Sequence, residues 1–211
     1  SWLSGSATTD GLFRTEANLL FATNGNNERM RIDSSGRLFV GGTVATPSTT
    51  SSDDIVIAGA GNVGLTINST NSAESAIFFA DGTSGSSQYM GQVTYYHSTD
   101  SLAFASAGSE RGRFDSSGRL LVGTTAVGAA AAETLTLAAS GNCGITIRGG
   151  ATSYSSIYFS DATSGTGQYA GSIQYGHQDD TLRFGANSLE RMRIDNLGRV
   201  GIMAQANSDA L

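Results

Sequence analysis

Arginine and acidic side chains recur together at three places in this chain, in a pattern that suits carboxylate recognition. The chain has twelve arginines and no lysine, and nine of the arginines lie in three related blocks, residues 28–37, 110–119 and 190–199. Each block begins with Glu-Arg and ends with Gly-Arg, and an Asp lies between them. A planar guanidinium can grip a carboxylate through two parallel hydrogen bonds, so the blocks are candidates for specific ionic contacts.

Each block also has the alternation of a β-strand, in which every second side chain points to the same face. The first two arginines and the Asp of each block are therefore predicted to share one face. Isolated surface ion pairs contribute only about 0–1 kcal/mol, so a spacing present in three copies suggests partners on neighbouring strands or chains. We predict nine assembly contacts: Arg29, Arg31, Asp33, Arg111, Arg113, Asp115, Arg191, Arg193 and Asp195.

The two histidines of the chain, His97 and His177, are each followed by an Asp three residues later. Imidazole suits Zn, Ni or Fe, and three such histidines around a threefold axis could bind a metal. No second ligand type recurs at a comparable spacing, so we expect a histidine at a strand end that is hydrogen-bonded to the following Asp. The sequence predicts neither a metal nor a cofactor.

Two pairs of adjacent carboxylates, Asp53-Asp54 and Asp179-Asp180, raise the question of glycoside hydrolysis. That reaction needs two carboxylates held across one bond, whereas neighbours on a strand point to opposite faces. Solvated turn residues are the favoured interpretation. No Ser/His/Asp set stands out, and no Lys follows the Gly-rich segments as in a phosphate-binding loop. We predict that the protein is not an enzyme.

Four aromatic residues could stack on sugars: Trp2, Tyr154, Tyr158 and Tyr169. Tyr169 has a matching tyrosine in a second copy of the surrounding sequence, which favours a role in the core or at an interface. Tyr154 is instead peculiar to one copy, as is Arg148. We therefore predict that Arg148 and Tyr154 are the residues through which a ligand would bind.

The last two arginine blocks belong to a longer duplication. Residues 55–123 align with 135–203 at a constant offset of 80 without a gap, and 27 of the 69 aligned positions are identical. Such internal repetition is typical of an array of modules more than of a single pocket. Because the chain does not begin with Met, we expect a fragment or a processed product. The predicted divisions are a partial repeat, two full modules and a tail, with the bounds 1–46, 47–128, 129–204 and 205–211.

Composition narrows the class of protein. A formal net charge of −6 and a pI near 4.7 argue against non-specific binding to nucleic acid or anionic membrane. No stretch approaches 18 apolar residues, so we expect no membrane insertion. The sequence has 28 glycines, one proline and short apolar runs between turn residues, which indicates an all-β chain. The single cysteine, Cys143, aligns with a valine and is expected to be a small buried residue.

The first full module can be divided into short strands by its apolar runs. Its block at 110–119 is expected to be one arm of a β-hairpin. The turn Asp115-Ser116-Ser117-Gly118 fits a type I turn, in which the final Gly can take a positive φ. The other expected strands are 55–57, 63–67, 76–79, 89–96, 101–105 and 120–122.

A module of about 80 residues with so little apolar content has a thin core, and the edges of its sheets need covering. Association of several chains about a common axis would solve both problems. We therefore predict elongated tandem β-modules that intertwine with other copies of the chain in an obligate homo-oligomer.

The run from Ser109 to Thr125 resembles the repeat found in bacteriophage tail fibre and tailspike proteins. The segments 77–85 and 95–104 resemble the companion segments of that repeat, and the likeness extends over about residues 19–203. Gly112 and Met203 depart from the family pattern. The resemblance implies a β-rich homotrimeric fibre in the virion, extracellular after release, with other phage tail proteins as partners.

Three functions are consistent with this resemblance. The favoured one is a structural segment of a phage tail fibre that supports host recognition and attachment. The alternative is a receptor-binding module that itself contacts a glycan or protein on the host surface. A polysaccharide-cleaving tailspike has the least support from the residues.

Overall fold

The computed structural model describes residue 15 and residues 17–25, 27–41 and 54–202. This part of the chain forms fifteen β-strands in three sheets, with two short 3-10 turns and no α-helix. The predicted all-β class is therefore confirmed. No helix in these residues is long and apolar enough to cross a membrane. Trp2, Asp53 and the predicted tail at 205–211 lie outside the described residues.

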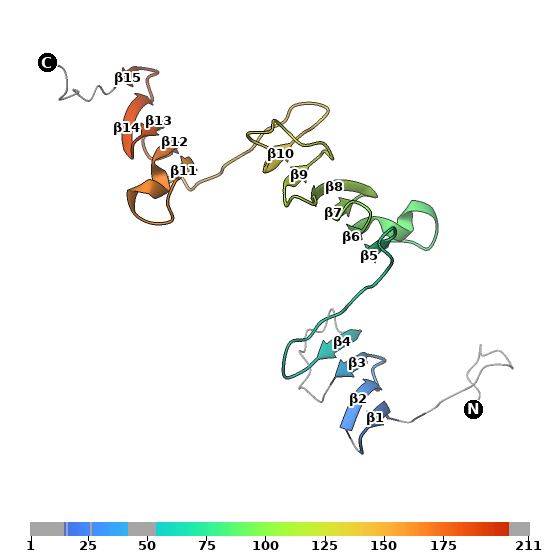
Figure 1. Ribbon diagram of the computed structural model, residues 1–211. Coiled ribbons are helices and arrows are strands. Elements are labelled where there is room, and N and C mark those ends of the chain that lie inside the picture. Colours follow the sequence, from blue (N-terminus) through green and yellow to red (C-terminus); the bar gives the residue numbers. More distant parts are fainter. Residues whose placement is uncertain (1–14, 16, 26, 42–53, 203–211) are drawn as a thin grey trace. The chain divides into compact units, whose positions relative to one another are not determined.

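The first sheet has four strands in the order β1-β2-β3-β4 (Figure 1). The pairs β1–β2 and β2–β3 are antiparallel, whereas β4 joins β3 in parallel. The bounds of its strands are β1 Leu19–Thr23, β2 Asn27–Ile32, β3 Leu38–Gly41 and β4 Ile55–Ala58.

The second sheet has the strand order β10-β9-β8-β7-β6-β5, and the third has β11-β12-β13-β14-β15. A 3-10 turn follows the first strand of each meander, η1 at Gly85–Tyr89 and η2 at Gly165–Tyr169. The strands of the second sheet are β5 Glu74–Phe79, β6 Gly91–Tyr96, β7 Ser101–Ser106, β8 Ser109–Phe114, β9 Leu120–Val122 and β10 Leu135–Leu137. Those of the third are β11 Tyr154–Phe159, β12 Gly171–Gly176, β13 Thr181–Ala186, β14 Leu189–Ile194 and β15 Val200–Ile202.

These two sheets repeat the same pairing at the 80-residue offset of the sequence duplication. Glu74 pairs with Tyr96 between β5 and β6, and Tyr154 pairs with Gly176 between β11 and β12. The last hairpins, β8–β9 and β14–β15, also keep the same register. The absence of gaps in the alignment predicted one fold for the two modules, and the observed strand order and pairing confirm it.

A parallel strand extends each of the first two sheets after a loop. At β10, the Leu120 N–H donates to the Thr134 carbonyl and the Ala138 N–H donates to the Val122 carbonyl, both at 2.9 Å. The second sheet therefore continues past residue 128 and takes in a strand from the sequence of the next module. The module bounds themselves stay a prediction of the sequence.

One face of the third sheet is apolar across all five strands, and we call it the apolar face. Two cross-strand rows make it up, Ile157–Ile173–Phe184–Met192–Ile202 and Tyr175–Leu182–Ile194–Val200. The opposite face, here called the polar face, carries the rows Ser156–Gln174–Arg183–Arg193 and Tyr158–Ser172–Gly185–Glu190.

The other two sheets have corresponding apolar faces, which follow from the same alternation along their strands. In the first sheet the rows are Phe21–Met30–Val40–Ile57 and Leu19–Ile32–Leu38–Ile55. In the second sheet they are Ile77–Val93–Phe104 and Phe114–Leu120–Leu135.

Two predictions about the first part of each module are wrong. Residues 63–67 do not form a strand, and Leu65 is 69% exposed, because no strand among the described residues lies alongside to complete a hydrogen-bonded ladder. The corresponding segment of the second module is also irregular, and its Cys143 is exposed instead of buried. The alternating apolar pattern is present in both segments, but an alternating pattern makes a strand only when it has a neighbour to pair with.

Candidate functional site

The turn at residues 115–119 is held by both oxygens of the Asp115 carboxylate. Oδ1 accepts from the backbone N–H groups of Ser117 (2.9 Å) and Arg119 (3.0 Å), and Oδ2 accepts from Arg119 Nε at 2.7 Å. The Gly118 N–H donates to the Asp115 carbonyl at 2.9 Å, and Gly118 has a φ of +77°. The predicted turn is confirmed, and we call this arrangement the Asp–Arg clamp.

All three blocks contain the clamp. Asp33 accepts from Arg37 Nε at 2.8 Å, and Asp195 accepts from Arg199 Nε at 2.6 Å, each together with the two backbone N–H bonds. The turn was predicted from the sequence, whereas the role of the Arg that follows it was not. The signal was present, because a Gly-Arg pair closes every block.

The clamps lower the pKa of their carboxyl groups below the ordinary value of 3.8. For Asp33 the main cause is the hydrogen bond from the Arg37 side chain; for Asp115 and Asp195 it is the bond from the backbone N–H of the clamp Arg. Desolvation raises each pKa and opposes part of this effect. The ionised form is favoured because every donor in the clamp points at the charge.

The lowered pKa values predict how the clamps respond to acid. A carboxyl group whose pKa is lower in the folded state stabilises the fold fully above its unfolded pKa, and this contribution is lost as the pH falls through the folded pKa. We expect the carboxyl carbon of Asp115 to titrate in NMR with a midpoint below 3.8. In Arg119→Gln the midpoint should rise towards the ordinary value. A midpoint at or above 3.8 in the unmodified protein would show that the hydrogen bonds of the clamp do not stabilise the ionised carboxylate.

The strict alternation predicted for the blocks is wrong in the first and third of them. Between β13 and β14, Phe184 pairs with Met192 but the next residue pairs with Glu190, so Arg191 is an extra residue in a β-bulge. Arg29 occupies the same place between β1 and β2. An extra residue shifts the side chains that follow it relative to the faces of the sheet, so alternation read from the sequence fails there.

The bulges bring Glu and Arg of one block together on the polar face. The Glu190 carboxylate accepts hydrogen bonds from Arg193 Nε at 2.5 Å and from Arg193 Nη2 at 2.9 Å. In the first block, Glu28 forms an ion pair with Arg31 at 3.3 Å. The Arg31 guanidinium also lies 4.5 Å from the ring centre of Phe39, which is its cross-strand partner and is buried. A cation over an aromatic face is attracted to it, so this arginine helps to cover a thin core.

The other predicted assembly arginines also have contacts within their own module. Arg29 Nε donates to Thr23 Oγ1 at 2.9 Å, and Arg191 Nε donates to the Ala186 carbonyl at 3.1 Å. In the second block, the Arg111 carbonyl accepts from the Gly123 N–H, and Arg113 pairs with Leu121 across β8 and β9. That the nine residues meet another chain stays a prediction.

The histidines do not bond to the following Asp, which corrects the expectation from sequence. His97 Nε2 lies 3.0 Å from Ser75 Oγ, and His177 Nε2 lies 2.9 Å from Ser155 Oγ. Each Ser hydroxyl is also placed to donate to a carbonyl, at 3.1 Å for Ile67. Because a carbonyl only accepts, the imidazole must donate if both bonds form. The pair therefore joins the His side chain to the loop that precedes β5 or β11 and holds that loop in place.

The Asp residues near the histidines have structural partners of their own. The Asp100 carboxylate accepts from Tyr95 OH at 3.2 Å, and Asp180 accepts from Tyr175 OH at 2.9 Å. Asp179 accepts from Thr181 Oγ1 at 2.8 Å and pairs with Arg183. The structure thus gives the two neighbouring carboxylates separate partners. Among the described residues, no group of three or more His, Cys, Asp or Glu side chains could hold a metal ion.

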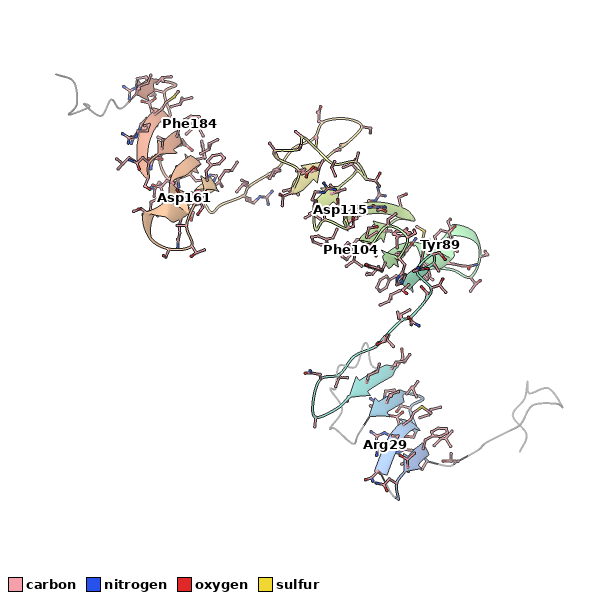
Figure 2. The ribbon with its side chains drawn as sticks, viewed as in Figure 1. Arg29, Tyr89, Phe104, Asp115, Asp161 and Phe184 are labelled. Carbon is pink, nitrogen blue, oxygen red and sulfur yellow. The ribbon has the colours of Figure 1, made fainter. Side chains whose placement is uncertain are left out.

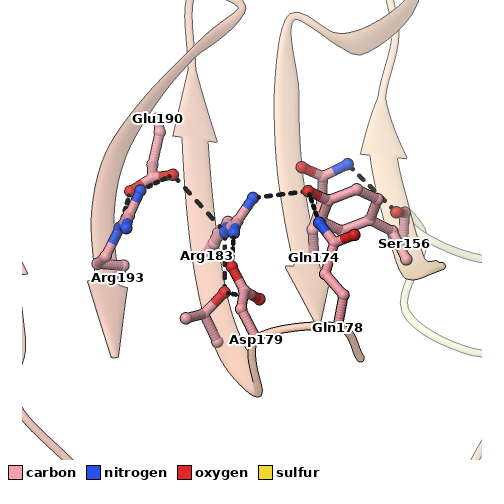
Figure 3. Close-up of polar contacts among 9 residues, drawn as sticks. Ser156, Gln174, Gln178, Asp179, Arg183, Glu190 and Arg193 are labelled. Carbon is pink, nitrogen blue, oxygen red and sulfur yellow. Dashed lines mark hydrogen bonds and ion pairs between the residues drawn. The ribbon is translucent and has the colours of Figure 1, made fainter. Parts of the chain in front are cut away.

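The two predicted ligand residues have different surroundings. Tyr154 begins β11, and its hydroxyl accepts from Gln178 Nε2 at 2.9 Å and Arg183 Nη1 at 3.0 Å (Figure 3). Arg148 is exposed in the irregular segment before β11, and no contact joins it to Tyr154 within the part of the chain that the structure describes. Tyr154 therefore belongs to a polar network on the third sheet.

The apolar faces carry many exposed apolar side chains. In the second sheet, Ile77, Phe79, Phe104 and Phe114 are between 41% and 60% exposed, and Phe184 is the counterpart of Phe104 in the third sheet (Figure 2). Only three described apolar residues are buried: Phe39, Ala103 and Leu121. Most apolar side chains therefore remain accessible to a partner.

A comparison with models of known protein families finds no match to this chain, and a comparison with curated proteins finds none either. What can be inferred about function comes from the repeated sheets, their apolar faces and the resemblance of the sequence blocks.

Proposed function

We propose that this chain is a structural segment of a phage tail fibre that supports host recognition and attachment. The observation that carries the proposal is the uncharged, exposed apolar face that recurs in all three sheets. A module that leaves its apolar side chains exposed needs other chains to complete its core. The sequence resemblance to tail fibre repeats supplies the biological setting.

Further copies of this chain cover the apolar faces. In the second sheet, seven side chains of this face are exposed, namely Ile77, Phe79, Tyr95, Phe104, Phe114, Val122 and Leu135. With an aromatic side chain presenting about 150–250 Å², they expose on the order of 500 Å², which is the size of patch that marks interaction sites. A second copy carries the same rows at the same spacing along its modules, so identical faces match along their length. The number three comes from the family resemblance.

The same arrangement supports a role without catalysis. The Ser–His pairs occur in both full modules and brace loops, and the adjacent Asp179 and Asp180 each have a structural partner. Groups that recur in successive modules serve the scaffold in the same way each time. We infer that the protein is a structural part of the fibre that supports the host-recognition parts, with other phage tail proteins as neighbours in the virion.

Immunogold labelling of the phage that encodes the chain tests this function directly. Antibodies raised against the purified chain should place gold along the tail fibres, and the same antibodies should reduce adsorption to host cells. Labelling confined to the capsid, or release of reducing sugar from host polysaccharide by the purified chain, would overturn the proposal. An antibody against the phage capsid protein serves as the control for position.

A further inference from the structure

A pocket lies on the polar face of the third sheet, away from the apolar face. Its cavity is about 300 Å³, and its lining includes Tyr158, Tyr169, Gln174, Arg183 and Glu190. These residues come from β11, η2, β12, β13 and the start of β14. One sheet of one chain therefore builds the whole pocket, so it does not depend on the proposed fibre role or on the number of chains.

The pocket uses residues that differ from those of the first full module. Ser172 and Gly185 are smaller than their counterparts Gln92 and Ala105. In the first module the Gln92 side chain donates from Nε2 to the Tyr89 carbonyl at 2.9 Å, and so covers the start of β6. A Ser at the same position leaves that space open in the second module.

Three polar residues of the pocket are also peculiar to the second module. Tyr158, Gln174 and Arg183 replace Phe78, Thr94 and Ala103, listed in the same order. Tyr158 and Arg183 add hydrogen-bonding side chains, and Gln174 has a longer amide where the first module has the Thr94 hydroxyl. Smaller residues in the pocket lining (Ser172 and Gly185), together with polar groups around them, are typical of a binding site more than of a repeated scaffold.

The Arg183 side chain is fixed in place by several neighbours (Figure 3). Its Nη1 donates to Tyr154 OH at 3.0 Å, its Nε donates to Thr181 Oγ1 at 2.9 Å, and its Nη2 pairs with Asp179. Glu190 lies 3.8 Å away and also pairs with Arg193. The positive charges are thus balanced by carboxylates. The pocket is polar without an excess of charge, which argues against an anionic ligand.

Groups that can bind hydroxyls remain available beside this network. Gln174 Nε2 donates to Tyr158 OH at 2.7 Å and to Ser156 Oγ at 3.2 Å, while its Oε1 accepts no hydrogen bond from the described residues. Tyr158 OH accepts from Gln174 and keeps its own proton to donate. An acceptor and a donor therefore lie side by side, as the hydroxyls of a sugar require.

Two tyrosine rings provide the apolar part of the site. The ring centres of Tyr158 and Tyr169 are 6.3 Å apart, and their planes meet at 56°. The two residues are 52% and 43% exposed, so both rings are accessible. A tyrosine is a rigid, amphipathic contact that loses little conformational entropy on binding. A pyranose ring offers C–H groups to such aromatic faces and hydroxyls at its rim.

We propose that this pocket binds one residue of a neutral saccharide against the exposed rings of Tyr158 and Tyr169, with Gln174, Arg183 and Glu190 contacting its hydroxyls. A volume of about 300 Å³ is at the lower end of the range for small-molecule sites, which suits a single sugar ring. Tyr154 supports the site by holding Arg183 and does not need to touch the sugar.

Saturation-transfer NMR with free monosaccharides tests the proposal on the full chain. The probes are glucose, galactose, mannose and N-acetylglucosamine, with the anionic N-acetylneuraminic acid for comparison. At least one neutral sugar should receive saturation from the protein, and Ser172→Gln should abolish the transfer by filling the pocket as Gln92 does. The matched control, Gln92→Ser in the first module, should leave the transfer unchanged.

Tyr158→Ala provides a second, independent variant, since an exposed side chain can be removed without loss of the fold. It should also abolish the transfer, because it removes one wall and the hydroxyl donor. Circular dichroism must show unchanged strand content in each variant. Transfer that survives in either pocket variant, transfer only to the anionic sugar, or no transfer to any neutral sugar would overturn the saccharide assignment, and none of these outcomes bears on the fibre role.

Discussion

Gly123→Ala is expected to lower the free energy of unfolding by about 3 kcal/mol, since it combines backbone strain with a steric clash. Gly123 has a φ of +73°, and a Cβ atom built there would lie 2.1 Å from the Ala138 carbonyl oxygen. The clash falls where β10 joins β9 in parallel, next to the bond from the Ala138 N–H to the Val122 carbonyl. The two strands would have to separate to make room.

Gly118→Ala is the matched control for this prediction. Gly118 has a similar φ of +77°, but a Cβ atom there would meet nothing within 4 Å. It should cost only about 1 kcal/mol, the strain of a positive φ. Urea unfolding at one fixed protein concentration measures both variants. Equal losses for the two substitutions would show that the parallel strand contributes little to the stability of the sheet.

Phe104→Asp is expected to weaken self-association at least 100-fold. Phe104 lies on the apolar face of the second sheet, in the row with Ile77 and Val93, and is 41% exposed in the single chain. If other copies cover this face, the new carboxylate is buried without a partner, at a cost of about 3–5 kcal/mol. Each 1.4 kcal/mol corresponds to a tenfold change in the dissociation constant.

Phe78→Asp makes the same chemical change on the opposite face. Phe78 is 54% exposed and follows Ile77 on β5, so its side chain points away from the apolar face of the second sheet. Its variant should keep the association of the unmodified protein. Sedimentation equilibrium of both variants distinguishes the faces. Loss of association in both, or in neither, would mean that the apolar face is not the contact surface.

Much of the fold could be predicted because the duplication and the turns are local in sequence. The 80-residue offset fixes equivalent strands, and an Asp followed three residues later by Gly identifies the hairpin turn at Asp115 and Gly118. The alternation of apolar residues gave most strands for the same reason. These signals depend on a few neighbouring residues, so they can be recognised without knowledge of the pairing.

The errors arose where pairing decides the structure. Residues 63–67 alternate like a strand but have no neighbouring strand in the described chain. The bulge at Arg191 depends on its register with β13, which no single strand reveals. The parallel pairing of β9 with β10 joins segments separated by a loop, and the sequence on either side carries no mark of it.

The candidate sites show the same limit. Module-specific residues were the signal used to predict a ligand site, and one of them, Tyr154, belongs to a polar network in the third sheet. The sequence could not show that Tyr158, Gln174 and Arg183 face the same cavity, because they come from three strands. Arg37, Arg119 and Arg199 were missed as clamp residues, since their role requires the turn geometry.

Multi-angle light scattering of the unmodified chain, at several concentrations and with and without denaturant, tests most directly whether other copies complete the apolar faces. We expect a native mass of about three times 21.7 kDa and a denatured mass of 21.7 kDa. A native dimer would keep the shared apolar face but contradict the trimer. A stable, folded monomer of 21.7 kDa would contradict the central claim, because the sheets of one chain would then cover their own apolar faces.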